Sequence, residues 1–202
     1  MAYENLLTYV EDDPATNLTV NTAWCYWNGQ EDEDTFLTRD FGAGHFGNFE
    51  HELKNYTHAN TEQGGQMSCW AVGTTKKNPN DWYSDGDDGI LLKATETVAG
   101  RFYFLQQIHD GSTTTDHWGG RSDSQWYDFI ITRSGTSVEC EIYDGASLED
   151  TLAVTVPSGD TYRYVFAAQG IAAATANSTG YTMNLELNEP DPVPFNQVIV
   201  VA

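Results

Sequence analysis

The chain alternates apolar and polar residues with a period of two along much of its length. The alternation is clearest in residues 18–24, 49–53, 102–108 and 138–142. Successive side chains of a β-strand point to opposite faces, so each of these segments predicts a strand with one buried face. Clusters of Gly, Asn and Asp separate the segments at short intervals, as turns between strands require. Many short strands joined by turns predict an all-β fold, either an antiparallel β-sandwich or a barrel.

Two stretches in the second half of the chain are predicted to be β-hairpins. Residues 127–143 form the first, with its turn at 134–136, and residues 151–168 form the second, with its turn at 157–160. Residues 170–176 are the one run that favours a helix. Because this run is too short for an ordinary amphipathic helix, it predicts a loop or a single turn.

The cysteines are predicted to lie in the core. In the first hairpin Cys140 shares a strand face with apolar residues, while Glu139 and Glu141 share the solvated face. Cys25, Cys69 and Cys140 are far apart in the sequence, and none belongs to a Cys-x-x-Cys pair. We therefore expect free buried thiols, with a single disulfide as the alternative.

The formal net charge of −21 excludes some classes of partner. Such a surface repels a phosphate backbone, so nucleic acid is not expected as a partner. No run approaches the ~20 apolar residues of a membrane span, so we expect no membrane insertion. The first residues lack the basic start and apolar run of a signal peptide. We expect a protein made without a signal peptide that stays in the cytoplasm or is released by lysis or in particles.

Several segments together resemble a known family. Residues 126–138, followed by 142–145 and 162–167, resemble the laminin-G-like branch of the concanavalin A-like lectin/glucanase jelly rolls. Residues 40–53 are similar to the first strand of such domains in phage and environmental surface proteins. The resemblance covers residues 15–188 and implies an antiparallel β-sandwich of the concanavalin A-like jelly-roll type. This fold hosts lectins, hydrolases and structural modules, so function depends on the site.

The resemblance also allows a test for catalysis. Retaining glycosidases of this fold carry a Glu-x-Asp-x-x-Glu motif, because two carboxyl groups must flank the scissile bond. The nearest match here is Glu50-x-Glu52, and Lys54 continues the same strand face without a third acid. We interpret these side chains as a solvated face, with His51 pointing inward and hydrogen-bonded. The sequence therefore predicts no catalytic residues and no enzyme.

An acidic turn is the candidate metal site. Asp85, Asp87 and Asp88 place three carboxylates within four residues, between glycines that permit a tight loop. Ca²⁺ takes six to eight oxygen ligands, so a calcium site is one interpretation and an Asp-rich turn is the other. Laminin-G-like domains often hold a structural calcium, which favours the first. Residues 31–34 are expected to form a solvated acidic loop, and the five scattered histidines predict no zinc triad.

Aromatic residues near predicted loops are the candidate glycan site. Sugar-binding proteins place exposed rings under the apolar face of a pyranose and surround it with polar groups. Two loop segments carry such a combination, and their candidate residues are Trp82, Tyr83, Asp116, Trp118 and Arg121. The alternative interpretation is that the rings fill the ends of the sandwich, because most Trp surface in proteins is buried.

The two ends of the chain are predicted to differ in structure. We expect residues 1–189 to form a single jelly-roll sandwich and residues 190–202 to form a Pro-rich arm that ends in a β-strand. Because residues 198–201 are apolar and β-branched, they should be covered, either by a neighbouring subunit in an oligomer or by the chain's own sheet.

The expected function is that of a non-catalytic, lectin-like module. We expect it on a virion or another extracellular particle, where it binds glycan or coats the surface. The alternatives are a purely structural subunit of a capsid, tail or filament, and a glycan hydrolase or lyase.

Overall fold

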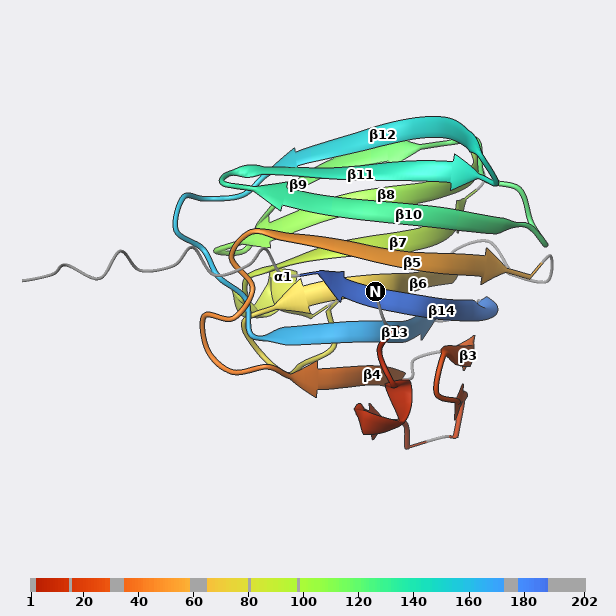
Figure 1. Cartoon of the computed structure of the whole chain (residues 1–202), viewed down its shortest axis with the longest axis horizontal. Helices are drawn as coiled ribbons and strands as arrows, with labels where there is room; N and C mark the ends of the chain where they lie inside the picture. Colours follow the sequence, from red (N-terminus) through yellow and green to blue (C-terminus); the bar gives the residue numbers. More distant parts are fainter. Residues whose placement is uncertain are drawn as a thin grey trace, which may run out of the picture.

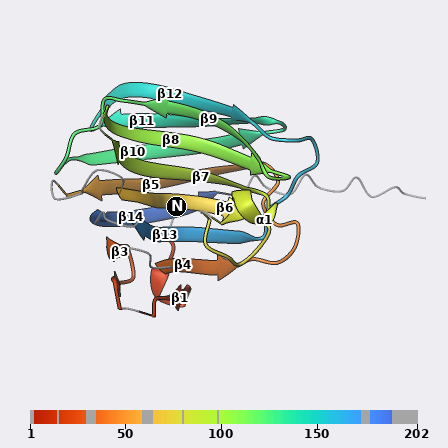
Figure 2. The same cartoon turned by 180° about the vertical axis from the view of Figure 1, so that it is seen from behind.

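The computed structural model describes residues 3–14, 16–29, 35–58, 65–79, 81–97, 99–172 and 178–188. Within these residues, two seven-stranded antiparallel sheets pack face to face. In Figure 1, β10, β5 and β14 of one sheet lie in front of β8, β7 and β6 of the other, and Figure 2 shows the reverse. The predicted all-β antiparallel sandwich is confirmed.

The strand order defines two sheets, which we call sheet A and sheet B. Sheet A has the order β1 (Val10–Asp12), β4 (Thr35–Asp40), β13 (Tyr164–Ala172), β6 (Gly65–Gly73), β7 (Gly89–Thr97), β8 (Gly100–His109) and β9 (Ser112–Trp118). Sheet B has the order β12 (Ser147–Thr155), β11 (Ser137–Asp144), β10 (Trp126–Ser134), β5 (Phe49–Thr57), β14 (Ser178–Asn188), β3 (Trp24–Gly29) and β2 (Leu18–Val20). A 3-10 helix, η1 (Leu6–Thr8), and a single α-helical turn, α1 (Trp82–Asp85), complete the described elements.

The predicted alternation corresponds to real strands with one exception. Strands β5, β8 and β11 contain the segments expected at 49–53, 102–108 and 138–142, and in β5 every second side chain is buried. The prediction of a single strand at 18–24 is wrong. This segment holds β2, a turn and the start of β3, because the N–H of Asn21 donates to the carbonyl of Trp24 at 2.8 Å and reverses the chain.

One predicted hairpin is confirmed and the other is wrong. Strands β10 and β11 pair directly, with Ser134 opposite Ser137, and Gly135 takes a φ of 62° in the turn. Strands β12 and β13, by contrast, belong to different sheets. Residues 156–163 therefore cross from sheet B to sheet A, and Tyr162 pairs there with Phe46. Alternating patterns on both sides of a turn cannot distinguish a hairpin from such a crossing.

The main core lies between the two sheets and includes the three cysteines. Cys25, Cys69 and Cys140 are buried and free, as expected. Burial raises the pKa of the Cys69 thiol to about 12, so this thiol is not reactive at neutral pH. His51 is also buried and accepts a hydrogen bond at 3.1 Å from the indole N–H of Trp70, which confirms its predicted inward, hydrogen-bonded position.

A smaller core covers the outer face of sheet A. Its buried members are Phe36, Ala71, Trp82, Leu91, Ile108 and Phe166. Trp82, on α1, reaches this face because Gly73 and Gly89 leave room for its ring. A Cβ on Gly89 would come within 2.1 Å of the ring, and one on Gly73 within 2.4 Å. The single turn α1 is therefore fixed to the sheet by one buried side chain.

Some sequence predictions fall partly or wholly outside the described residues. Residues 170–172, predicted as a loop or turn, form the end of β13, and residues 173–177 lie outside the description. The acidic run at 31–34 and the arm at 190–202 also lie outside it. In the described part of the chain, no helix is long and apolar enough to span a membrane.

Candidate functional site

The structure separates the five residues predicted to bind glycan. Trp82 and Tyr83 belong to α1, which lies against the β8–β9 turn at Gly111. Trp118 ends β9, which starts beside that turn. A seven-residue strand is ~20 Å long at about 3.3 Å per residue, so the two predicted groups do not form one surface.

Burial corrects two of these predictions. Trp82 is fully buried in the smaller core, so its ring offers no face to a sugar. Arg121 is also buried, and its guanidinium lies 5.9 Å from the ring centre of Tyr103. Trp118 is half-buried and stacks parallel to Tyr103, with 6.4 Å between ring centres. The packing role given above as the alternative accounts for these three side chains.

Asp116 and Tyr83 remain accessible. The Asp116 carboxylate accepts the backbone N–H of Ala153 at 3.0 Å and so ties β9 to β12. Tyr83 is 56% exposed, but no other exposed ring accompanies it on α1. Neither residue brings together the rings and polar groups that the glycan hypothesis requires.

The three carboxylates of the predicted calcium site do not converge. Asp85 and Asp87 both form ion pairs with Lys77, at 3.0 and 3.1 Å. Asp88 instead lies 3.1 Å from Nδ1 of His109. The acidic-turn interpretation therefore accounts for Asp85 and Asp87, because both carboxylates already pair with Lys77.

The outer face of sheet B carries a row of aromatic side chains that the sequence analysis did not identify as a site. Trp126, Tyr56, Tyr181 and Tyr26 occupy matching positions on β10, β5, β14 and β3. Ring centres are 5.1 Å apart for Tyr56 and Trp126, and 4.9 Å apart for Tyr26 and Tyr181. All four rings are half-buried or exposed, and Trp126 is 39% exposed. We call these four residues the aromatic row.

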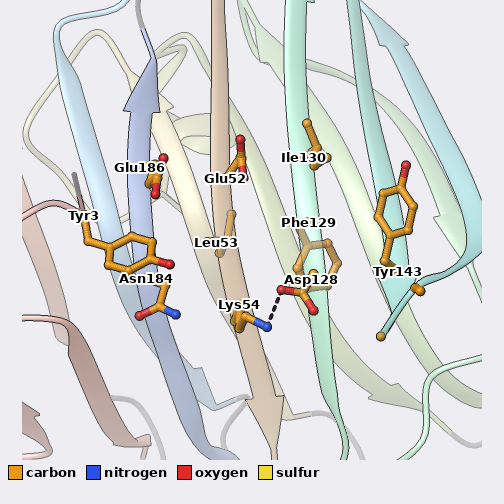
Figure 3. Close-up of a pocket in the computed structure, with 12 residues that line it drawn as sticks. Tyr3, Glu52, Leu53, Lys54, Asp128, Phe129, Ile130, Tyr143, Asn184 and Glu186 are labelled. Atoms are coloured by element: carbon orange, nitrogen blue, oxygen red, sulfur yellow. Dashed lines mark ion pairs between the residues drawn. The ribbon is translucent and has the colours of Figure 1, made fainter. Parts of the chain in front are cut away.

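A hollow of about 340 Å³ lies on the same sheet face, beside the aromatic row. Figure 3 shows the side chains that line it, among them Tyr3, Glu52, Lys54, Asp128, Ile130, Tyr143, Asn184 and Glu186. On β5, Glu52, Lys54 and Tyr56 share one face, because alternate residues of a strand do so. Glu52 and Lys54 line the hollow, and Tyr56 next to them belongs to the aromatic row. Lys54 pairs with Asp128 on β10 at 2.6 Å (Figure 3). We call this feature the acidic hollow.

Two glutamates face each other across neighbouring strands in the acidic hollow. Glu52 on β5 is the register partner of Glu186 on β14. Partial burial, followed by the charges of Glu186 and Glu50, raises the pKa of Glu52 above its ordinary value. The hollow therefore concentrates negative charge, and Lys54 is the one cation among the described residues that line it.

A bulge in β14 shapes the part of the acidic hollow that this strand lines. The ladder with β5 shifts register between Met183 and Glu186. Asn184 within the shift has a φ of 56°, a left-handed conformation that Asn tolerates better than most residues. Its N–H donates to the carbonyl of Ala23 at 2.8 Å, which fixes the bulge. Because of this bulge, both Asn184 and Glu186 line the hollow (Figure 3).

Comparison with known proteins identifies the fold. No family model and no curated protein sequence matches the chain. Among solved structures, it is similar to the Bacillus licheniformis β-glucanase, with a TM-score of 0.62, 12% identity, and coverage of 94% of this chain and 97% of that one. The exoplasmic/lumenal domain of VIP36, in its Ca²⁺/Man3GlcNAc-bound form, gives a TM-score of 0.63 at 10% identity over 92% and 86%. The legume lectin-like domain from Entamoeba histolytica gives 0.61 at 15% identity over 90% of each chain.

The fold is a concanavalin A-like jelly roll. The expected jelly-roll fold is thereby confirmed, whereas membership of the superfamily, its laminin-G-like branch and the phage setting stay predictions. In this jelly roll the aromatic row and the acidic hollow are built from β3, β5, β10 and β14, which are adjacent in sheet B. The site thus lies on the outer face of strands that are not at the sheet edge. Each of these strands is paired on both sides, which holds its side chains in place.

The site of this jelly roll combines three kinds of chemistry. The rings of the aromatic row can pack against apolar faces, the carboxylates of Glu52 and Glu186 can accept hydrogen bonds from hydroxyl groups, and the Asn184 amide can donate and accept. The period-two placement of Tyr56 and Trp126 on their strands could have indicated outward rings. Their assembly into a row depends on the β10–β5–β14–β3 order, which no local pattern encodes.

Proposed function

We propose that this protein is a non-catalytic, glycan-binding module and that its binding surface is the outer face of sheet B. One observation carries the proposal, namely that the aromatic row borders a hollow lined by carboxylates and an amide. Sugars offer an apolar ring face and a set of hydroxyl groups, and the row and the hollow match these two features. The similarity to the VIP36 domain, whose solved structure is a glycan-bound form, supports the same function.

The charge of the surface narrows the class of glycan. Among the described lining residues, the hollow contains Glu52, Asp128 and Glu186 against Lys54, and the whole chain has a net charge of −21. Sulfated or other acidic glycans would be repelled by this field. We therefore propose a neutral glycan as the ligand.

The missing catalytic motif favours binding over hydrolysis. Retaining glycosidases of this fold carry Glu-x-Asp-x-x-Glu on one strand, which places an acid and a nucleophile beside the scissile bond. Strand β5 has only Glu50-x-Glu52 followed by Lys54, and Glu186, the register partner of Glu52, belongs to another strand. A hydrolase remains the rival suggested by the β-glucanase neighbour, and turnover of a glycan that is lost in Glu52→Gln would support it.

The proposed setting is the surface of a virion or another extracellular particle. The chain's acidity supports this setting, because mutual repulsion keeps densely displayed copies soluble. Association with a particle without any glycan binding would favour the rival role of a structural assembly subunit.

A glycan array followed by calorimetric titration tests the proposal. We expect binding to neutral glycans and a loss of at least tenfold in affinity, about 1.4 kcal/mol, for Trp126→Ala and for Tyr56→Ala. Tyr83→Ala is the matched control, because it removes an exposed ring outside the aromatic row and should leave the affinity unchanged. Equal affinity for all variants would contradict the proposed surface, and an array without any binding would contradict glycan binding itself.

A further inference from the structure

Three potential metal ligands converge at one end of sheet A. The ligand atoms of Asp88, His109 and Asp160 all lie within 4.8 Å of one another. Nδ1 of His109 is 3.1 Å from Oδ1 of Asp88 and 3.6 Å from Oδ2 of Asp160. Ligand atoms at about 2.1 Å in a tetrahedron lie about 3.4 Å apart, so these two separations suit a single bound ion.

The converging atoms do not satisfy one another by hydrogen bonding. Nδ1 of His109 and Oδ2 of Asp160 are both shielded from solvent, yet neither makes a hydrogen bond. His109 lies at ion-pair distance from both carboxylates, but within the described residues Nδ1 of His109 and Oδ2 of Asp160 form no hydrogen bond. Buried polar atoms without partners are uncommon and indicate a missing water or ion.

A buried tyrosine provides a second, independent indication. Tyr162 is fully buried, and its hydroxyl has no hydrogen-bond partner. Tyr162 lies two residues after Asp160, in the same segment that crosses between the sheets. A water held in an open coordination position would give this hydroxyl a partner.

We propose that Asp88, His109 and Asp160 form a binding site for a divalent transition-metal ion of the zinc class. Two carboxylates and one imidazole are a donor set that suits Zn²⁺, Mn²⁺ or Co²⁺, whereas Ca²⁺ prefers oxygen ligands alone. Nε2 of His109 lies 3.4 Å from the Asp110 carboxylate. A carboxylate on the far nitrogen is the arrangement that orients metal-bound histidines.

The backbone holds the three ligands in place. Asp88 precedes β7 and His109 ends β8, and these two strands pair with Gly89 opposite Ile108. Asp88 also accepts the backbone N–H of Asp110 at 3.0 Å. Asp160 belongs to the segment that crosses from sheet B to sheet A, so a bound ion would tie this crossing to β7 and β8. Binding of the ion does not depend on glycan binding.

Metal titration of the chelator-treated protein near pH 7.5 tests the site. We expect Zn²⁺ to bind with 1:1 stoichiometry and to raise the melting temperature, because an ion that binds the folded state stabilises it by mass action. Asp160→Asn and His109→Gln should each weaken Zn²⁺ binding at least tenfold. Asp85→Asn is the matched control, since it removes a nearby carboxylate that pairs with Lys77, and it should bind Zn²⁺ like the wild type.

Two further measurements separate a lost ligand from a damaged fold. Circular dichroism and the melting temperature in chelator show whether each variant is folded, and the visible spectrum of bound Co²⁺ reports the ligands directly. A Co²⁺ spectrum in the wild type that is altered in Asp160→Asn would support the site. Absence of 1:1 binding, equal affinity of Asp160→Asn and wild type, or tighter binding of Ca²⁺ than of Zn²⁺ would overturn the proposal.

Discussion

Trp82 illustrates how a single side chain can organise a segment of this protein. The ring lies over Gly73 and Gly89, which are register partners on β6 and β7, and contacts Phe166 edge to face at 5.4 Å. It is the one buried residue of α1. The contact therefore holds the acidic turn that follows α1 at a fixed place on sheet A, where Asp88 meets His109.

The space above Gly89 gives the first prediction. Gly89→Ala would place a methyl group within 2.1 Å of the Trp82 ring, and overpacking of this kind costs about 1–3 kcal/mol of stability. Urea unfolding should show this loss. Gly47→Ala is the control, because nothing lies within 4 Å of a Cβ there. Equal stability of the two variants would mean that Trp82 does not occupy this position.

The second prediction concerns the charge of Glu52. Burial and the neighbouring Glu186 raise its pKa in the folded protein above the ordinary value of 4.5, so the ionised form is disfavoured by folding. Stability should therefore fall as the pH rises through the folded pKa of Glu52, and the cost is absent below pH 4.5, where both states are protonated.

Glu52→Gln should accordingly stabilise the protein at pH 7 by up to about 0.5 kcal/mol, since the group is only partly buried and solvent screens its charge. The gain should disappear near pH 4. Glu139→Gln, on the exposed side of β11, is the control and should show no such dependence. A pH-independent effect of Glu52→Gln would argue against repulsion in the acidic hollow.

At the scale of elements, the bulge in β14 connects backbone conformation with the site. Asn184 adopts a φ of 56°, where a side chain with a Cβ costs about 1–2 kcal/mol unless it is Asn, Asp or Gly. We predict that Asn184→Ala is less stable than Asn184→Gly by about 1 kcal/mol. Thermal unfolding of both variants measures the difference. The opposite order would show that the side chain, rather than the backbone, determines the bulge.

The elements also show what the sequence can and cannot predict. The alternation in β5 and β11 is sufficient to predict both strands and their buried faces, because burial of one face imposes a period of two. The crossing at 156–163 is wrongly predicted as a hairpin, because a turn motif looks the same whether the chain returns to the same sheet or changes sheets. The aromatic row and the Asp88, His109 and Asp160 group depend on such long-range pairing, so spacing alone could not predict them.

At the scale of the whole molecule, the sequence predicts the fold but not the position of the proposed glycan site. Alternation and turns predict the sandwich, and the resemblance at residues 126–145 adds its jelly-roll type. The sequence favours a glycan site at Trp82 and Trp118, because both Trp residues lie near predicted loops. The packed structure buries the first ring and half-buries the second, and leaves Trp126 and three tyrosines on a sheet face instead.

The central claim is that glycan binds to the outer face of sheet B. The most direct test is a nuclear magnetic resonance titration of the tryptophan indole N–H signals with the neutral glycan selected on the array. We expect that the signal of Trp126 shifts with saturation, as does that of Trp24, whose half-buried ring lies 5.9 Å from the ring of Tyr181 in the row. The signals of the buried Trp27, Trp70 and Trp82 should not shift. Shifts confined to Trp82 and Trp118, with Trp126 unchanged, would contradict it.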